Sequence, residues 1–402
     1  MSSTWVDGAA GSAYDIDNLP YGVFVRGDDA PRVGVRIGDL VLDLAPVAAA
    51  DQLDLAPVLA APSLNPLMAQ GPDAWRSVRR WVTALLSDPA RRGDVEPHLV
   101  PLSQVSLRMP IEVGDYVDFY ASEAHASNVG RIFRPDQEPL LPNWRHLPVG
   151  YHGRSGTVVP SGTPVVRPHG QRKAPADDAP TFGPSTRLDI EAELGFVVGT
   201  PSAQGDRVSV AGFAEHVFGV VGLNDWSARD VQAWEYVPLG PFLGKSFATS
   251  ISQWVTPLEA LDAAWVDLPG QDPRPLDYLA VEGRGGLDIA IEVEVNGHVV
   301  SRPPFASMYW GPAQMLAHLT VNGASLRTGD LFASGTVSGT EKDQRGSFLE
   351  MSWGWKEPFR VGDEERIALE DGDEVVLRYT APGTRGGRIA LGEVRGRIEP
   401  AR

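Results

Sequence analysis

Residues 188–198 have the sequence Leu188-Asp-Ile-Glu-Ala-Glu-Leu-Gly-Phe-Val-Val198, which carries the pattern of a buried β-strand. The apolar residues that flank its three acidic ones predict burial: Leu188, Ile190, Leu194, Phe196, Val197 and Val198. Residues 217–223 form a second apolar strand of this kind. Residues 289–295 alternate apolar and polar side chains and lead into Asn296-Gly297, the strongest short hairpin signal in the chain. We therefore predict a mainly β fold.

The glycine and proline content supports this interpretation. The 402 residues include 43 glycines and 34 prolines, spread along the chain, and such frequent turn residues suit many short strands better than long helices. We expect further strands at 330–335, 347–353, 373–379 and 387–398, and helices at 226–235 and near 307–319.

The first hundred residues predict a small β unit followed by helices. Apolar and polar residues alternate in 21–26 and 32–37 around a turn, and 40–44 follows them, as in a compact barrel or meander. In 73–87 the apolar residues recur at three- and four-residue spacing, which predicts an amphipathic helix with Asp73 at its N-cap.

Chemistry-bearing residues are unevenly divided along the chain. Residues 1–110 gather no carboxylates, histidines or loop glycines into a chemical group, so we interpret this part as a packing or dimer-forming unit. From about residue 115 the polar side chains become dense. We therefore divide the chain into an N-terminal domain, 1–114, and one β-rich domain with two layers of sheet, 115–402.

Charge and composition exclude several classes of protein. With 35 Lys and Arg against 52 Asp and Glu, the formal charge is −17, which argues against nucleic-acid or membrane-surface binding. No apolar stretch approaches the roughly 18–20 residues of a membrane-spanning helix, and the first residues have no basic flank or apolar signal core. The absence of cysteine excludes disulfides, thiolate metal sites and cysteine nucleophiles. The expected location is the cytoplasm.

Three familiar catalytic or binding motifs are incomplete or absent. The segment from Gly240 to Ser246 resembles a phosphate-binding loop, but three residues separate its glycines where four are needed, and no evident strand precedes it. The chain has no Gly-x-Ser-x-Gly elbow of a serine hydrolase and no His-Glu-x-x-His pair of a zinc protease.

Four acidic residues are candidates for a metal site. Glu191 and Glu193 lie two residues apart on the predicted strand, so their side chains point to the same face. Taken by itself, such a pair is typical of a solvent-exposed face of a strand. The flanking apolar residues predict burial instead, and buried carboxylates need a partner that offsets their charge. Asp118 and Asp225, which directly follows an apolar strand, are further candidates. A hard divalent cation takes such oxygen ligands.

A histidine and a polar group form the remaining candidates. His125 lies seven residues after Asp118, and it is either a structural histidine or a general base. Arg229 and Gln232 share one face of the predicted helix. Tyr236 and Lys245 complete this group. Arg229 and Gln232 either bind an oxyanion together with Lys245 or belong to a capped surface helix.

Five sequence blocks resemble the fumarylacetoacetate hydrolase family. They occur in family order, and the second and third are long and specific: Pro142-Asn-Trp-Arg-His-Leu-Pro-Val-Gly-Tyr-His-Gly-Arg154 and Trp234-Glu-Tyr-Val-Pro-Leu-Gly-Pro-Phe-Leu-Gly-Lys245, the latter within 224–247. The others cover residues 115–130, 329–339 and 349–353.

The resemblance implies a fold and an activity. The fold is a small SH3-like N-terminal barrel followed by a larger mixed β-sandwich or roll, assembled as a homodimer. The activity is hydrolysis of a C–C bond in 4-fumarylacetoacetate to give fumarate and acetoacetate, the last step of tyrosine and phenylalanine breakdown.

The resemblance also assigns roles by position. Asp118, Glu191, Glu193 and Asp225 resemble the ligands of a divalent cation, Mg²⁺ or Ca²⁺. Lys245 and Thr249 fall where a second, structural magnesium sits beside Asp225, although Ala248 stands where the family pattern has glycine. His125 resembles the catalytic base and Glu350 its orienting partner. The residues that resemble the polar group around the reacting carbonyl are Arg229, Gln232 and Lys245, and those that resemble substrate contacts are Tyr120, Arg134, Tyr151, Gln232, Tyr236 and Thr336.

The implied chemistry agrees with these residues, and two alternatives compete with it. A cation that chelates a β-diketone stabilises the enolate that leaves, while His125 deprotonates water and Glu350 supports the imidazolium. Acylpyruvate hydrolases and keto-acid decarboxylases or isomerases of the wider superfamily share the acidic site, but the presence of both His125 and Glu350 and the long N-terminal domain argue against them. A non-enzymatic binding protein is expected to lack one of these residues.

Overall fold

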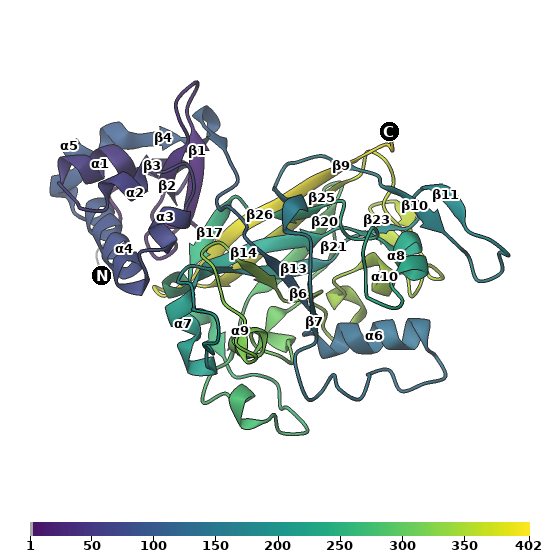
Figure 1. The fold of residues 1–402 in the computed structure, drawn as a ribbon. Helices are drawn as coiled ribbons and strands as arrows, with labels where there is room; N and C mark the ends of the chain where they lie inside the picture. The colour runs from purple at the N-terminus through teal and green to yellow at the C-terminus, as the bar shows by residue number, and fades with distance from the viewer. Residues whose placement is uncertain (1–2) are drawn as a thin grey trace.

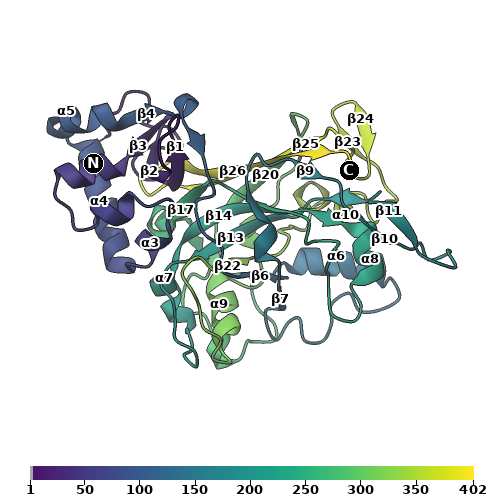
Figure 2. The same ribbon diagram turned by 45° about the horizontal axis from the view of Figure 1, so that its top comes forward.

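The computed structural model describes residues 3–402. A smaller N-terminal unit lies beside a larger part built mainly of strands (Figure 1, Figure 2). The whole is a mixed α/β fold with more strand than helix, so the prediction of a mainly β chain understated the helices. None of the helices in residues 3–402 has the length and apolar character needed to cross a membrane.

The N-terminal unit follows the predicted order of elements. Strands β1 (Tyr21–Val25), β2 (Arg32–Ile37) and β3 (Leu40–Asp43) pair antiparallel in sequence, and β4 (Leu99–Pro101) pairs with β3. The helices are α1 (Leu44–Ala50), α2 (Ala56–Leu59), α3 (Asn65–Met68), the longer α4 (Pro72–Ser87) and α5 (Arg92–Val95); α3 and α5 contact α4.

Helix α4 confirms the amphipathic helix expected at 73–87, but its N-cap was predicted wrongly. Gly71 occupies the N-cap and Pro72 begins the helix, since proline needs no backbone donor in the first turn. Asp73 instead lies inside the first turn, where its carboxylate meets Arg76 at 2.6 Å. The buried face consists of Val78, Val82, Leu85 and Leu86.

One sheet runs through both parts of the chain. Its main path is β4-β3-β2-β1-β17-β14-β13-β22-β6-β7, and the N-terminal strands join it where β1 pairs with β17 (Trp254–Pro257). The strands that carry the site are β14 (Val217–Asp225), β13 (Ala192–Val198), β22 (Leu331–Ala333), β6 (Tyr116–Phe119) and β7 (Gly150–His152). Strand β16 (Thr249–Ile251) pairs with β14 and with β8 (Val158–Pro160).

A second sheet of order β21-β20-β25-β26-β9 packs against the first. Its strands are β21 (His298–Ser301), β20 (Ala290–Val295), β25 (Glu374–Pro382), β26 (Arg388–Glu399) and β9 (Val165–Val166). Tyr379 of β25 is fully buried, and its hydroxyl bonds to the backbone N–H and carbonyl of Leu223 in β14, each at 3.1 Å. Gly222 makes room for that ring, because a Cβ there would lie 2.3 Å from it.

Several predicted elements are confirmed. The hairpin at Asn296-Gly297 forms, with φ of 51° and 82° at these two residues, as the two-residue turn requires. The strands expected at 217–223, 330–335, 373–379 and 387–398 correspond to β14, β22, β25 and β26. The helix expected near 307–319 is α9 (Pro312–Thr320), preceded by a 3₁₀ turn at Phe305–Ser307.

Three predicted elements differ from the structure. The strand at 188–198 is broken into β12 (Leu188–Asp189) and β13, with Ile190 and Glu191 between them. The expected strand at 347–353 is the short helix α10 (Phe348–Met351), because the Ser347 hydroxyl caps it by accepting from the backbone N–H of Glu350. The helix expected from 226 begins only at Arg229, as α8 (Arg229–Glu235), since β15 (Ser227–Ala228) pairs with β12.

Candidate active site and metal centre

The four predicted carboxylates meet in one buried cluster. Oxygen atoms of Asp118, Glu191, Glu193 and Asp225 all lie within 4.8 Å of one another, and all four residues are buried. Asp118 comes from β6, Glu193 from β13 and Asp225 from the end of β14, while Glu191 occupies the break between β12 and β13. These strands are close in the order β14-β13-β22-β6.

The strand register explains why these side chains converge. Ala192 lies opposite Asn224, and the backbone N–H of Asp225 donates to the carbonyl of Glu191 at 3.1 Å. On the other side, Ala333 of β22 pairs with Asp118. The break at Ile190 and Glu191 leaves Glu191 and Glu193 directed into the same space, as their two-residue spacing predicted.

Three cationic side chains contact this carboxylate cluster. Nζ of Lys245 bonds to Asp225 at 2.7 Å and also to Glu191, and Nη2 of Arg229 lies 2.7 Å from Glu191. Arg154 contacts both Asp118 and Asp225. Sequence reasoning did not single out Arg154.

The cluster has the properties of a divalent-cation site. Oδ1 of Asp118 and Oε1 of Glu193 are buried and have no hydrogen-bond partner within residues 3–402, which is costly for carboxylates unless a cation binds them. Burial, reinforced by the charge of Asp225, raises the pKa of Asp118 to about 7. Burial and the neighbouring carboxylates raise the pKa of Glu193 well above its usual range. A ligand set that consists only of oxygen atoms suits Mg²⁺ or Ca²⁺.

Strand pairing also places Tyr151 and Thr249 beside the cluster. Tyr151 lies opposite Asp118 and donates its hydroxyl to Oδ2 of that residue at 2.9 Å. Thr249 lies opposite Asp225 and donates to Oδ1 at 2.7 Å. Lys245 and Thr249 therefore contact the same carboxylate, and Ala248 beside them is buried.

A histidine–carboxylate pair lies next to the cluster. His125 comes from α6 (Glu123–Phe133), and its Nδ1 donates to Oε2 of Glu350, in α10, at 2.7 Å. Glu350 is fully buried and accepts three more hydrogen bonds, from Asn128, Ser338 and Ser347. Burial raises its pKa, but the charge of His125 and these donors outweigh burial, so the pKa of Glu350 is below its ordinary value.

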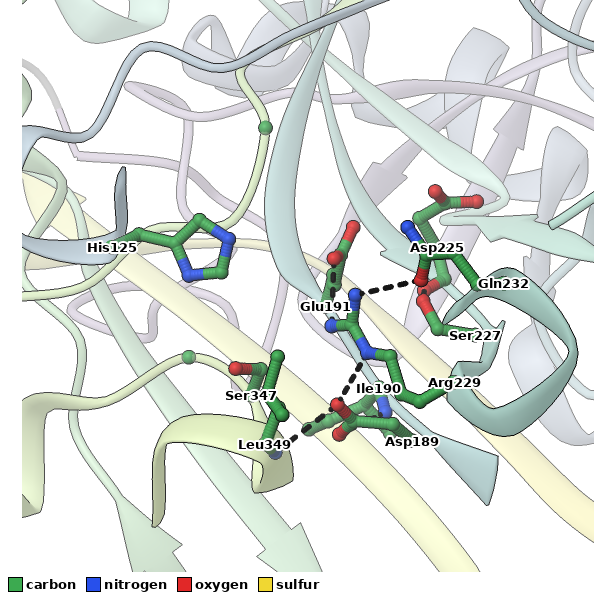
Figure 3. A network of polar contacts seen from close by, with 12 residues as sticks. His125, Asp189, Ile190, Glu191, Asp225, Ser227, Arg229, Gln232, Ser347 and Leu349 are labelled. Atoms are coloured by element: carbon green, nitrogen blue, oxygen red, sulfur yellow. Dashed lines mark hydrogen bonds and ion pairs between the residues drawn. The ribbon is translucent and has the colours of Figure 1, made fainter. Parts of the chain in front are cut away.

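The pair is oriented for proton transfer. Because the lowered pKa of Glu350 favours its ionised form, and a carboxylate only accepts hydrogen bonds, Nδ1 is the donor and Nε2 is left as the basic nitrogen. The imidazole projects from α6 toward Glu191 (Figure 3). Tyr120 packs edge-on against this ring, with centroids 5.3 Å apart. In both overall views α6, α8 and α10 lie at the same end of the large sheet (Figure 1, Figure 2).

Arg229 connects the cluster to α8 and to a further aspartate. Its Nη1 donates to Oε1 of Gln232 at 3.1 Å, one helical turn along α8, and its Nε donates to Asp189 at 2.8 Å (Figure 3). The charges of Glu191 and Asp189 outweigh burial and raise the pKa of Arg229. Asp189 lies within the quoted 188–198 stretch, but nothing in its spacing singled it out.

The other predicted substrate contacts differ in their surroundings. Thr336 is buried, and its hydroxyl has no hydrogen-bond partner in the described part of the chain. Its neighbour Gly335 donates a backbone N–H to Glu193 at 3.1 Å. Arg134 donates to the carbonyl of Pro139 at 3.1 Å. Tyr236 is 49% exposed beyond the end of α8, and the described structure gives its hydroxyl no contact with the carboxylate cluster.

Five further residues of the site were not identified from sequence. Asn128 follows His125 by one turn of α6, and a polar residue at that spacing is a weak signal. The others reach the site only through tertiary contacts: Arg154, Asp189, Ser338 and Ser347.

The fold and the site together indicate an enzyme whose buried carboxylate cluster is suited to a divalent cation. The sequence matches the family Fumarylacetoacetate (FAA) hydrolase C-terminal over residues 116–399 and Fumarylacetoacetase N-terminal over residues 17–110. The chain therefore belongs to the fumarylacetoacetate hydrolase family, and the resemblance seen in the sequence is confirmed.

Curated relatives and solved structures agree with this assignment. Fumarylacetoacetase from Homo sapiens is 45% identical over 414 residues, covering 98% of this chain and 98% of the relative. The solved fumarylacetoacetate hydrolase from Exiguobacterium antarcticum has a TM-score of 0.56 at 18% identity, covering 96% of this chain and 100% of that one. Maleylpyruvate hydrolase from Sphingobium, solved with manganese(II) and pyruvate, has a TM-score of 0.51 at 17% identity, with coverage of 96% and 100%. At these identities the two structures show the shared fold alone.

Proposed function

We infer that this chain is a hydrolase that cleaves 4-fumarylacetoacetate into fumarate and acetoacetate, the last step of tyrosine and phenylalanine breakdown. Full-length similarity to fumarylacetoacetases supports the substrate. The observation that carries the chemistry is the buried His125–Glu350 pair, joined at 2.7 Å, beside four buried carboxylates. Such a pair can activate water next to a site that holds a cation.

The carboxylate cluster would hold the divalent cation. Asp118, Glu191, Glu193 and Asp225 are its proposed ligands, and the unpartnered oxygens of Asp118 and Glu193 support this. The cation, Mg²⁺ or Ca²⁺, would supply Lewis acidity to the diketone oxygens and to the departing enolate. We also propose a second, structural magnesium beside Asp225, at Lys245 and Thr249. The contacts of both side chains with Asp225 support only the proximity of these three residues.

His125 would act as the general base. Its Nε2 takes a proton from water, and the water oxygen forms a bond to the carbonyl carbon of the ketone. The C–C bond then breaks, and its electron pair leaves with the acetoacetate enolate, which takes up a proton. The charge of Glu350 stabilises the imidazolium, and its bond to Nδ1 keeps the ring in the basic tautomer.

The polar residues around the base would bind the substrate oxygens. Arg229, Gln232 and Lys245 supply donors to the alkoxide that forms at the attacked carbonyl. Arg134 offers a fork of donors to the terminal carboxylate. The remaining proposed substrate contacts are Tyr120, Tyr151, Gln232, Tyr236 and Thr336.

Organisation above the single site is also part of the proposal. We place the boundary between a structural domain of residues 1–114, built as an SH3-like barrel, and a catalytic β-sandwich or roll of residues 115–402. The first part of the sequence has no cluster of carboxylates, histidines or loop glycines, which supports a role in packing and in a homodimer. The proposed location is the cytoplasm. We expect no nucleic-acid or membrane partners, and the formal charge of −17 supports that expectation.

Substrate cleavage with product analysis tests this function. Purified protein with Mg²⁺ is expected to remove the ultraviolet absorbance of 4-fumarylacetoacetate and to release fumarate and acetoacetate in equal amounts, as NMR would detect. An acylpyruvate serves as the competing substrate. Cleavage of the acylpyruvate without cleavage of 4-fumarylacetoacetate would show that the chain is a different hydrolase of the same fold.

A further inference from the structure

Asp189 is a fully buried carboxylate to which the proposed reaction gives no role. It lies at the end of β12, next to the two residues between β12 and β13, one of which is Glu191. A buried aspartate is costly unless its oxygens are hydrogen-bonded, so the partners of Asp189 indicate what it does.

All four hydrogen-bond partners of Asp189 are donors. Oδ2 accepts from Nε of Arg229 at 2.8 Å and from the backbone N–H of Leu349 at 3.1 Å. Oδ1 accepts from the backbone N–H of Phe348 at 2.6 Å and of Ile190 at 2.7 Å. Figure 3 shows Asp189 between Arg229 on one side and the start of α10 on the other. Only a carboxylate satisfies this set of partners, because every one donates.

The first consequence concerns the histidine–carboxylate pair. Phe348 and Leu349 are the first two residues of α10, and Glu350 is the third. Asp189 binds the backbone just before Glu350 and so fixes the position from which that side chain reaches His125. Ser347 also caps this helix, yet α10 has only four residues, so each anchor matters for its placement.

The second consequence concerns the guanidinium. Asp189 holds Arg229 through Nε, which leaves Nη2 beside Glu191 at 2.7 Å and Nη1 bonded to Gln232 at 3.1 Å. Since the guanidinium is planar, fixing Nε fixes the direction of both terminal nitrogens. Without this anchor Arg229 could turn wholly toward the carboxylate cluster.

We propose that Asp189 is a positioning residue that locks Arg229 and α10 into one geometry, so that the guanidinium and the His125–Glu350 pair face the same reacting carbonyl. This role rests on the proposed function for its chemistry. Its geometric part, the support of the His125–Glu350 contact, is independent of which substrate is cleaved.

The substitution Asp189→Asn tests the proposal with little change in size. An amide nitrogen places a donor against a donor, so at least one partner loses its bond. Asp373→Asn is the matched control. Asp373 is also buried and accepts from the backbone N–H of Glu370 at 2.7 Å and from Asn296 at 2.8 Å, but it contacts none of the proposed site residues.

The first measurement is spectroscopic and needs no substrate. The proton between Nδ1 of His125 and Glu350 is expected to give a low-field NMR resonance, assigned by its loss in His125→Ala. Asp189→Asn should shift or remove this resonance while the protein remains folded, as circular dichroism would report. Asp373→Asn should lower the unfolding temperature and leave the resonance in place.

The second measurement separates kcat from KM. Residues that orient the groups of a site by hydrogen bonds to them typically contribute about 10- to 100-fold to activity. Asp189→Asn should therefore lower kcat by about that factor, with little change in KM. If Asp189→Asn does not accumulate as folded protein, Asp189→Glu takes its place, because it keeps the charge but displaces the oxygens by one methylene group. An unchanged resonance together with wild-type kcat in a folded variant would overturn the proposal. Lack of cleavage by the wild-type protein would instead refute the proposed function and leave the resonance test standing.

Discussion

Replacing Glu350 by glutamine separates the charge of this residue from its hydrogen bonds. The carboxylate accepts from His125, Ser338 and Ser347 on one oxygen and from Asn128 on the other. In Glu350→Gln the amide oxygen can keep the first three partners, and Asn128 can rotate its amide to accept from the new NH₂ group. The substitution therefore preserves the tautomer of His125 while it removes the negative charge opposite the imidazolium.

The expected loss follows from that charge. With Nδ1 and Oε2 2.7 Å apart, the two charge centres lie about 4 Å apart, where an effective dielectric of ~20 gives about 4 kcal/mol. At about 1.4 kcal/mol for each factor of ten, kcat should fall about 10³-fold. This is somewhat less than the ~10⁴-fold loss when a triad carboxylate is replaced and the tautomer is also lost.

A double-mutant cycle on kcat is the assay. His125→Ala should be at least as damaging as Glu350→Gln, and the double variant little worse than His125→Ala, because residues that act as one unit are non-additive. Titration of each variant with Mg²⁺ should show almost unchanged affinity, since neither residue is a proposed ligand. Losses that multiply independently, or a large fall in Mg²⁺ affinity in Glu350→Gln, would refute this account of Glu350.

Three further predictions concern pH, substrate binding and assembly. The folded-state pKa of Glu350 lies below its ordinary value of 4.5, so its ionised form stabilises the fold above pH 4.5, and this contribution disappears as the pH falls through the folded-state pKa. The difference in unfolding free energy between wild type and Glu350→Gln should therefore shrink over that pH range. A difference independent of pH would contradict this prediction. Arg134→Gln should raise KM about 10- to 100-fold, because a hydrogen bond to a charged group contributes about 1.5–3 kcal/mol. For a substrate ester that lacks the terminal charge, wild type and Arg134→Gln should have similar KM values. An unchanged KM for the acid substrate would exclude this contact. Light scattering should give about twice the chain mass of 43.3 kDa, and a monomer at micromolar concentration would contradict the dimer.

The carboxylate cluster could be predicted because its signals are local. Glu191 and Glu193 have the spacing that places two side chains on one face, and Asp225 ends an apolar strand. Their convergence with Asp118 depends on strand order, which spacing alone does not give. Residue type and predicted burial made the four residues candidates, and the family resemblance implied that they act together as ligands. The structure brings the four together through β14, β13, β22 and β6.

The parts that could not be predicted depend on tertiary contacts. The 188–198 stretch alternates apolar and acidic residues as far as Leu194 and is apolar after it, a pattern typical of one uninterrupted strand, so nothing local marks the break at Ile190 and Glu191. Helix α10 is too short to show a helical period, and its first turn is held by the cap from Ser347 and by two backbone N–H groups that donate to Asp189. Arg154 has no spacing signal, because its partners lie on distant strands.

The central claim is that the four carboxylates hold a divalent cation on which C–C cleavage depends. The most direct measurement is the rate of 4-fumarylacetoacetate cleavage by protein stripped with a chelator and shown by elemental analysis to be metal-free, before and after addition of Mg²⁺. We predict no turnover before addition, restoration after it, and no restoration at the same Mg²⁺ concentration in Glu193→Gln, which changes a buried oxygen that otherwise has no partner. Full activity in the verified metal-free protein would contradict the account.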